Sequence, residues 1–179
     1  MNTNSGRAAA SISLTGALMF LSSSFAAAGN APQSACRAMP PQSPQSPYGT
    51  LVKCSASPGL APYYLHRPPG DVEGAPVIVA VHGISRNARE QVRAFGSHAA
   101  RQGFVTLAPR FSRTRFPGYQ RLGHCRHGRG PMPELALAGM LDEVRDMTGA
   151  DTSRVFLFGF SGGAQFAHRF ALCTPGRVK

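Results

Sequence analysis

Acidic residues are scarce in this chain of 179 residues, which has 8 Asp and Glu against 19 Lys and Arg and a net charge of +11. This balance excludes an acidic disordered chain and leaves nucleic acid, a membrane surface or an anionic substrate as possible partners. Lysine is also nearly absent, since only Lys53 and Lys179 stand beside 17 arginines. The codon usage of a GC-rich genome explains that skew as well as a function does, so charge alone selects none of these partners.

Long hydrophobic runs are missing as well. The most hydrophobic stretch lies within Met1 to Ala28. Serines and a threonine interrupt it, so it is much shorter than the roughly 20 apolar residues of a membrane-spanning helix. This segment has one basic residue, Arg7, no acid, and small residues at its end, which is the pattern of a secretory signal peptide cleaved after Ala26 or Ala28. We therefore expect residues 1–28 to be a signal peptide, with an uncleaved anchor as the alternative. The protein is then exported, periplasmic or extracellular, and has no stable membrane span after cleavage.

The four cysteines contain no C-x-x-C pair, which weakens the case for a metal site. Cys125 lies in His124-Cys125-Arg126-His127 among arginines whose charge opposes a bound cation, so no metal is expected. In an oxidising compartment the cysteines would form disulfides, for which three pairings are possible. We favour Cys36 with Cys54 and Cys125 with Cys173.

The remaining chain divides into a leading segment and one domain. Residues 29–48 are rich in Pro, Gln and Ser, and we expect 32–47 to be extended and without packed structure. From residue 49 onward, strand and helix patterns alternate with short connections, which predicts an α/β fold with a mostly parallel sheet flanked by helices on both faces. The apolar, β-branched run at 77–81 and the run at 155–158 are typical of strands buried on both faces. The other expected strands are 50–55, 63–66 and 104–108, and the expected helices end near 102, near 149 and at 173.

The pentapeptide Gly159-Phe160-Ser161-Gly162-Gly163 fits the pattern G-x-S-x-G. It stands directly after the strand 155–158 and directly before a helix, which is the context of a nucleophile elbow. Such a turn strains the backbone of the serine and brings strand and helix so close that side chains at 159 and 163 would collide. We therefore predict that Ser161 is a nucleophile at the positive end of a helix, with a glycine-rich turn without catalysis as the alternative.

A second loop, about 80 positions upstream, follows the strand 77–81 with the sequence His82-Gly83-Ile84-Ser85. A loop at this place supplies one backbone N–H of an oxyanion hole, and the residue after the nucleophile supplies the other. Ile84 and Gly162 are therefore the candidate oxyanion donors. His82 is interpreted as a structural residue that braces the loop rather than as the catalytic base. Where a serine lies on a nucleophile elbow of this kind, the catalytic triad follows the chain order Ser, acid, His, and His82 precedes Ser161.

These motifs resemble the α/β-hydrolase superfamily. His82-Gly83 after one strand, Asp151 to Val155 leading into another, and the elbow around Ser161 are similar to exported esterases of the polyhydroxybutyrate depolymerase and feruloyl esterase type and to dienelactone-hydrolase-like enzymes. The resemblance covers roughly residues 77–172. It implies ester hydrolysis through an acyl-enzyme on Ser161, a small-molecule or polymeric ester as substrate, no metal and no organic cofactor.

The chain departs from this pattern after the elbow. In the family, the acid and the histidine of the triad follow later strands, whereas here the sequence ends one helix beyond Ser161, with Arg177-Val178-Lys179 similar to the start of a further strand. His168 follows Ser161 by seven residues and is interpreted as a helix-surface histidine. Because a serine without a base is a poor nucleophile, we expect this chain alone to be a weak catalyst and the N-terminal part of a longer or incomplete enzyme.

Ten arginines and one acid, Glu90, lie between Arg86 and Arg129. Arg110, Arg113 and Arg115 follow the strand 104–108 at the sheet edge where ligands bind in open α/β sheets, so they are candidate contacts for a carboxylated or phosphorylated ester, with a solvated surface as the alternative. Two other functions stay open. One is a non-catalytic carbohydrate-binding or polymer-binding relative. The other is a nucleic-acid-binding module, which ranks last because no known nucleic-acid motif is present, so no nucleic acid is expected.

Overall fold

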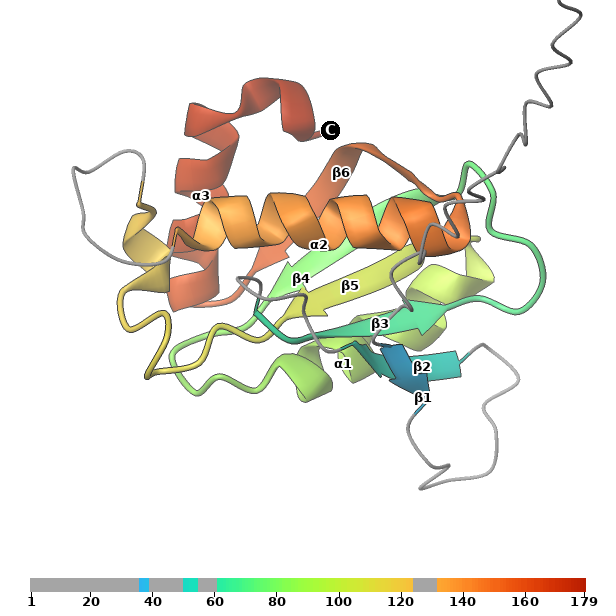
Figure 1. The fold of residues 1–179 in the computed structure, drawn as a ribbon, viewed down its shortest axis with the longest axis horizontal. Coiled ribbons are helices and arrows are strands. Elements are labelled where there is room, and N and C mark those ends of the chain that lie inside the picture. Colours follow the sequence, from blue (N-terminus) through green and yellow to red (C-terminus); the bar gives the residue numbers. More distant parts are fainter. Residues whose placement is uncertain (1–35, 39–49, 55–60, 124–131) are drawn as a thin grey trace, which may run out of the picture. The chain divides into compact units, whose positions relative to one another are not determined.

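A computed structural model describes residues 36–38, 50–54, 61–123 and 132–179. These residues form a six-stranded sheet in the order β1-β2-β3-β5-β4-β6 (Figure 1). The strands are β1 (Cys36–Ala38), β2 (Thr50–Cys54), β3 (Tyr63–Arg67), β4 (Pro76–Val81), β5 (Val105–Pro109) and β6 (Asp151–Gly159). The helices are α1 (Ala88–Arg101), α2 (Pro133–Thr148) and α3 (Gly162–Cys173), with short 3-10 helices η1 (Tyr119–Arg121) and η2 (Pro175–Arg177). The proposed signal peptide lies outside the described residues.

The sheet has a parallel half and an antiparallel half. β5, β4 and β6 run parallel, with Val79 opposite Leu107 and Val81 opposite Gly159. β1, β2 and β3 are antiparallel to their neighbours. The expected α/β fold is thus confirmed. The parallel register brings the carboxyl ends of β4, β5 and β6 to one edge of the sheet, so the segments that follow these three strands meet there.

The two faces of the sheet differ in how well they are covered. α2 crosses in front of the sheet and α1 lies behind it (Figure 1). On the α2 side, Leu137, Met140, Leu141 and Val144 are fully buried in one large core cluster. On the α1 side, the second cluster contains only three buried residues, namely Ala88, Val92 and Ala108. The apolar core of the described residues is therefore built mainly on the α2 face.

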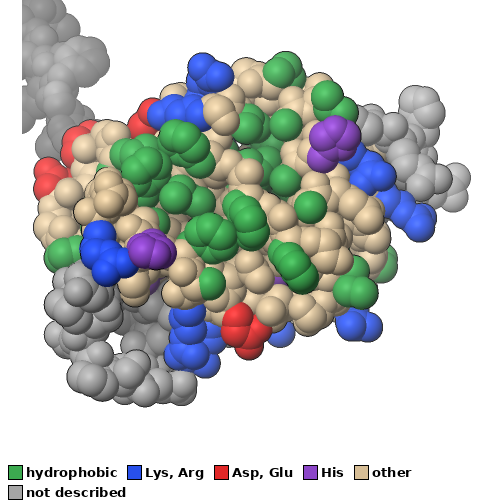
Figure 2. Space-filling view, turned by 180° about the vertical axis from the view of Figure 1, so that it is seen from behind, with side chains coloured by type: hydrophobic (Ala, Val, Ile, Leu, Met, Phe, Trp, Pro, Cys, Tyr) green, Lys and Arg blue, Asp and Glu red, His purple; other side chains and the backbone are tan. Residues whose placement is uncertain are grey.

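The prediction that β6 is buried on both faces is wrong. Phe156 and Phe158 are 41% and 40% exposed, and they contact Phe104 and Phe95, which lie at the α1 side. Figure 2 shows hydrophobic side chains gathered on this rear face of the molecule. No helix beyond α1 covers this face among the residues that the structure describes, which is why the two phenylalanines stay half open to solvent.

The expectation that residues 32–47 lack packed structure is also wrong in part. Cys36–Ala38 form strand β1, which pairs with β2 in a register that places Cys36 opposite Cys54. The rest of that segment is outside the described residues. Cys173 is disulfide-bonded.

The last residues of the chain extend the sheet beyond β6. Val178 forms a parallel bridge with Val155 of β6, and Lys179 N–H donates to Val155 O at 2.9 Å.

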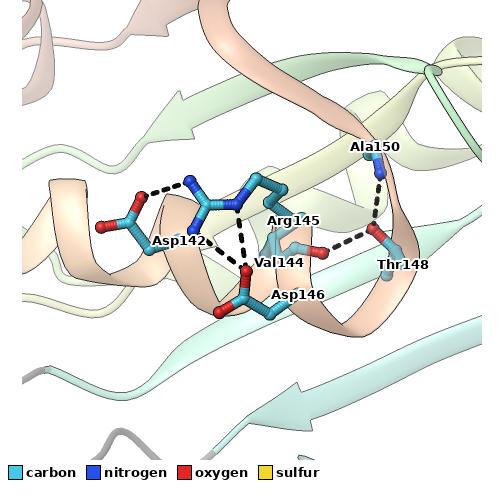
Figure 3. A network of polar contacts seen from close by, with 6 residues as sticks. All are labelled: Asp142, Val144, Arg145, Asp146, Thr148 and Ala150. Carbon is cyan, nitrogen blue, oxygen red and sulfur yellow. Dashed lines mark hydrogen bonds and ion pairs between the residues drawn. The ribbon is translucent and has the colours of Figure 1, made fainter.

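The end of α2 shows how local sequence fixes an element boundary. Gly149 has a positive φ of 70°, and its N–H donates to Arg145 O, which closes the helix as the sequence predicts. The Thr148 hydroxyl donates to Val144 O at 2.6 Å and accepts from Ala150 N–H at 3.2 Å (Figure 3). The chain thereby turns directly into β6.

None of the helices in the described segments has the length and apolar character needed to cross a membrane.

Candidate active site

Ser161 lies at the junction of β6 and α3 in a strained backbone conformation. Its φ is 53° and its ψ is −114°, and it is one of three non-glycine residues with positive φ in the described segments. The side chain is exposed, whereas the next residue, Gly162, is buried. Ser161 is the residue before the first turn of α3, so its hydroxyl lies at the end of the helix where N–H groups have no partner within the helix.

Two glycines make this sharp turn possible. A Cβ atom on Gly159 would lie 2.1 Å from Gly163 O, and a Cβ atom on Gly163 would lie 2.2 Å from Val81 O. Both contacts are with backbone atoms, which cannot move aside as the end of a side chain can. The spacing of the glycines in the pentapeptide therefore reflects the close approach of α3 to β6 and β4.

The loop after β4 lies directly against the elbow. A Cβ atom on Gly83 would be 3.5 Å from Ser161 Cβ and 3.3 Å from Phe160 O, so this glycine lets the two turns touch. The next residue, Ile84, is 63% exposed, and its Cγ2 lies 3.1 Å from the position of a Cβ on Gly162. The two residues proposed as oxyanion donors from the sequence, Ile84 and Gly162, are thus neighbours beside Ser161.

His82 holds this loop through both ring nitrogens. Its Nδ1 donates to Gly83 O at 2.8 Å, and its Nε2 accepts from Phe111 N–H at 3.1 Å, which defines the neutral tautomer with the proton on Nδ1. The ring is fully buried. Burial, with the charges of Arg86 and Arg110, lowers the pKa of His82 to about 4, although the hydrogen bond to Gly83 opposes the shift. His82 contacts backbone groups and is not hydrogen-bonded to Ser161.

Arg86 and Tyr119 complete this support, a role that sequence reasoning assigned to neither residue. The Arg86 guanidinium donates to Phe111 O, to Phe116 O at 3.0 Å and to Pro117 O at 3.1 Å, and it lies 4.5 Å from the centre of the Tyr119 ring. The Tyr119 hydroxyl donates to His82 O at 2.6 Å. The one sequence signal at this place is the richness of the loop in arginines, and it does not distinguish Arg86 from the others.

Among the described residues, no acidic or histidine side chain is hydrogen-bonded to Ser161. In the described ranges, its hydroxyl makes no hydrogen bond. Asp142 and Asp146 both pair with Arg145 on the outer face of α2 (Figure 3). His168 is exposed on α3, and His124 and His127 lie outside the described residues. No group of three or more His, Cys, Asp or Glu side chains in the described part could hold a metal ion.

The three arginines predicted to contact substrate all lie on the segment that follows β5. Arg110, Arg113 and Arg115 are exposed. Arg113 Nη2 donates to Ile84 O at 3.4 Å, so this side chain reaches the loop beside Ser161. The Arg115 guanidinium instead lies 5.7 Å from the centre of the Phe116 ring, on its own segment. Of the three, Arg113 hydrogen-bonds to the proposed oxyanion loop, while the charge of Arg110 acts on His82 of that loop.

Solved structures with the same fold include several hydrolases. Poly(aspartic acid) hydrolase-1 from Sphingomonas sp. KT-1 matches with a TM-score of 0.60 and 24% identity, over 75% of this chain and 55% of that one. LpqC, a poly(3-hydroxybutyrate) depolymerase from Bordetella parapertussis, matches with a TM-score of 0.55 and 28% identity, over 68% and 46%. An S-formylglutathione hydrolase from Agrobacterium tumefaciens matches with a TM-score of 0.60 and 18% identity, over 75% and 57%. No protein-family model and no curated protein sequence matches the chain.

These neighbours are α/β-hydrolase proteins, in agreement with the resemblance that the sequence motifs indicate. The described part of the chain therefore has a partial α/β-hydrolase fold, with the elbow and the loop after β4 at the same sheet edge. The chain spans about half the length of each of these structures.

Proposed function

We propose that this protein is a serine hydrolase of carboxylic esters and that Ser161 is its nucleophile. The observation that carries the proposal is the conformation of Ser161, an exposed serine held at φ 53° and ψ −114° between a strand and a helix N-terminus. A backbone in this rarely populated region persists only where the surrounding structure enforces it, and such strain occurs preferentially at functional sites.

The proposed reaction uses the two turns that meet at the elbow. The Ser161 oxygen attacks the ester carbonyl carbon, the serine proton passes to a base, and the alcohol leaves to give an acyl-enzyme that water hydrolyses. The N–H groups of Ile84 and Gly162 stabilise the negative charge that develops on the carbonyl oxygen. No imidazole is hydrogen-bonded to Ser161 among the described residues, so the proposal assigns the base and its acid to residues outside them.

The nature of the neighbours supports an ester or a related polymer as substrate. One neighbour is a poly(3-hydroxybutyrate) depolymerase, and it has 28% sequence identity with this chain. Another is a poly(aspartic acid) hydrolase. Export of the protein is part of the proposal as well, because the disulfide of Cys173 is typical of an oxidising compartment.

The test is covalent labelling of the serine. A neutral alkyl fluorophosphonate should add one phosphonyl group to the protein, and peptide mapping should find it on Ser161. The Ser161→Ala protein should stay unlabelled. Labelling of Ser112, another serine at the same sheet edge, or equal labelling of both proteins, would refute the assignment.

A further inference from the structure

We propose that the substrate carries a carboxylate close to the scissile ester and that Arg113 binds this carboxylate. The inference rests on the proposed function and adds the chemical class of the substrate. It follows from where the Arg113 guanidinium lies, from what it contacts, and from the charges around it.

The Arg113 guanidinium lies close to one of the two proposed oxyanion donors, the N–H of Ile84. Its Nη2 lies 3.4 Å from the carbonyl oxygen of Ile84, whose N–H is a proposed oxyanion donor. Since one residue spans at most about 3.6 Å, the guanidinium is within roughly 7 Å of that N–H. A substrate whose carbonyl oxygen accepts from Ile84 N–H can therefore reach Arg113 with a carboxylate only a few bonds away.

The hydrogen-bonding capacity of Arg113 is largely unused. A guanidinium has five N–H donors, and those of Arg86 are directed at backbone carbonyls of residues 111, 116 and 117. Within the described residues, Arg113 makes one long hydrogen bond, to Ile84 O, and its side chain is exposed. The planar group can therefore present two parallel N–H donors to a carboxylate, a geometry that lysine does not offer.

Among the described residues, Arg113 has no ion pair with an acidic side chain. Burial lowers the pKa of the Arg86 guanidinium and the charge of Arg113 lowers it as well, so the two groups are close enough to repel each other. Ion pairs of the described residues include those of Arg145 on the outer face of α2 and that between Lys179 and Asp151, all away from Arg113 in the sequence. A surface that carries charge of one sign attracts ligands of the opposite sign.

The experiment measures binding to the Ser161→Ala protein, in which the ligand is not hydrolysed. Monomethyl glutarate is titrated by NMR and compared with methyl glutaramate, which has an amide in place of the carboxylate. We expect the carboxylate to bind about fivefold more tightly at low ionic strength, and the difference to shrink in 0.5 M sodium chloride, a condition that shortens the Debye length to about 4 Å.

Two further variants identify the residue responsible. Arg113→Gln should remove the preference for the carboxylate, and Arg113→Lys should keep part of it. Arg177→Gln removes the same charge from η2, beside Asp151 and Ser153 at the start of β6, and should keep the whole preference. No preference in the starting protein, or equal loss in the Arg113→Gln and Arg177→Gln proteins, would overturn the inference.

The outcome is separable from that of the proposed function. Labelling of Ser161 by a neutral fluorophosphonate involves no contact with Arg113. If labelling fails while the carboxylate preference holds, the hydrolase assignment is wrong and the carboxylate site stands. If labelling succeeds and the preference is absent, the hydrolase assignment stands and Arg113 is a surface residue.

Discussion

At the scale of the residue, the proposed nucleophile Ser161 has a backbone conformation that should lower the stability of the fold. Its φ of 53° and ψ of −114° suit glycine better than any residue with a side chain. We predict that Ser161→Gly raises the free energy of unfolding by about 1 kcal/mol relative to Ser161→Ala, since relief of strain exceeds the entropy cost of glycine. Both substitutions remove the hydroxyl, so urea unfolding of the pair isolates the backbone effect. A glycine variant that is less stable than the alanine variant would show that the turn is not strained.

His82 should make stability depend on pH. Its pKa is lowered from 6.5 to about 4 in the folded chain because the buried ring binds a proton poorly. Above pH 6.5 the ring is neutral in both states, and as pH falls from 6.5 towards 4 the unfolded chain takes up the proton first. This contribution to stability, about 3 kcal/mol, is therefore lost across that window.

The measurement is the free energy of unfolding at pH 7 and at pH 4.5 for the unaltered chain and for His82→Gln. The variant cannot gain this proton, so its stability should fall less over the same interval. His66, whose pKa is also lowered by burial, is present in both proteins and cancels in the comparison. An identical fall in the two proteins would remove His82 as the cause.

At the scale of the element, the packing of α3 onto β4 depends on Gly163. Alanine usually stabilises a helix by about 1 kcal/mol relative to glycine. Here its Cβ would lie 2.2 Å from Val81 O, so we predict that Gly163→Ala destabilises the fold by about 2 to 4 kcal/mol.

Gly176→Ala is the matched control for this substitution. No atom lies within 4 Å of the position of its Cβ, and Gly176 has no positive φ, so the unfolding midpoint should stay unchanged. If Gly163→Ala unfolded at the same urea concentration as the control, α3 would not be held against β4 as closely as described.

The elements that sequence predicted best are those whose signal is local. The run Val77–Val81 and the glycine spacing around Ser161 each carry their information within a few residues, and β4, β6 and α3 form where these patterns predict. Strand β1 escaped prediction because three residues in a Pro-rich segment become a strand only by pairing with β2. Likewise, the contacts of Arg86 with residues 25 to 31 positions later follow from the fold and from no local pattern.

The candidate site was predictable in its outline and not in its support. A G-x-S-x-G pattern after a strand can be recognised from the sequence alone, and so can a His-Gly pair after another strand. The contact of Tyr119 with His82 O and the reach of Arg113 to Ile84 O join segments about 30 residues or more apart. Such contacts depend on the parallel register that brings the ends of β4 and β5 together.

At the scale of the whole molecule, the open face behind the sheet should control association. Phe156 and Phe158 are each about two-fifths exposed on the side that α1 covers only in part. Exposed apolar patches of this kind favour self-association. We therefore predict that the chain forms oligomers or aggregates in light scattering, and that Phe158→Thr, which suits a strand, lowers the mean particle mass.

Leu135→Gln provides the control for this prediction. Leu135 is 61% exposed on α2, on the opposite face, so replacing it should leave the particle mass unchanged. A monodisperse starting chain with a single cooperative thermal transition would contradict the prediction, as would an equal effect of the two substitutions.

The arrangement around Ser161 can be tested most directly by a crystal structure of the phosphonylated protein. The phosphonyl oxygen takes the place of the oxyanion, and we predict that it lies 2.7 to 3.1 Å from the backbone nitrogens of both Ile84 and Gly162. A phosphonyl oxygen that faces solvent, with neither N–H directed at it, would contradict the account.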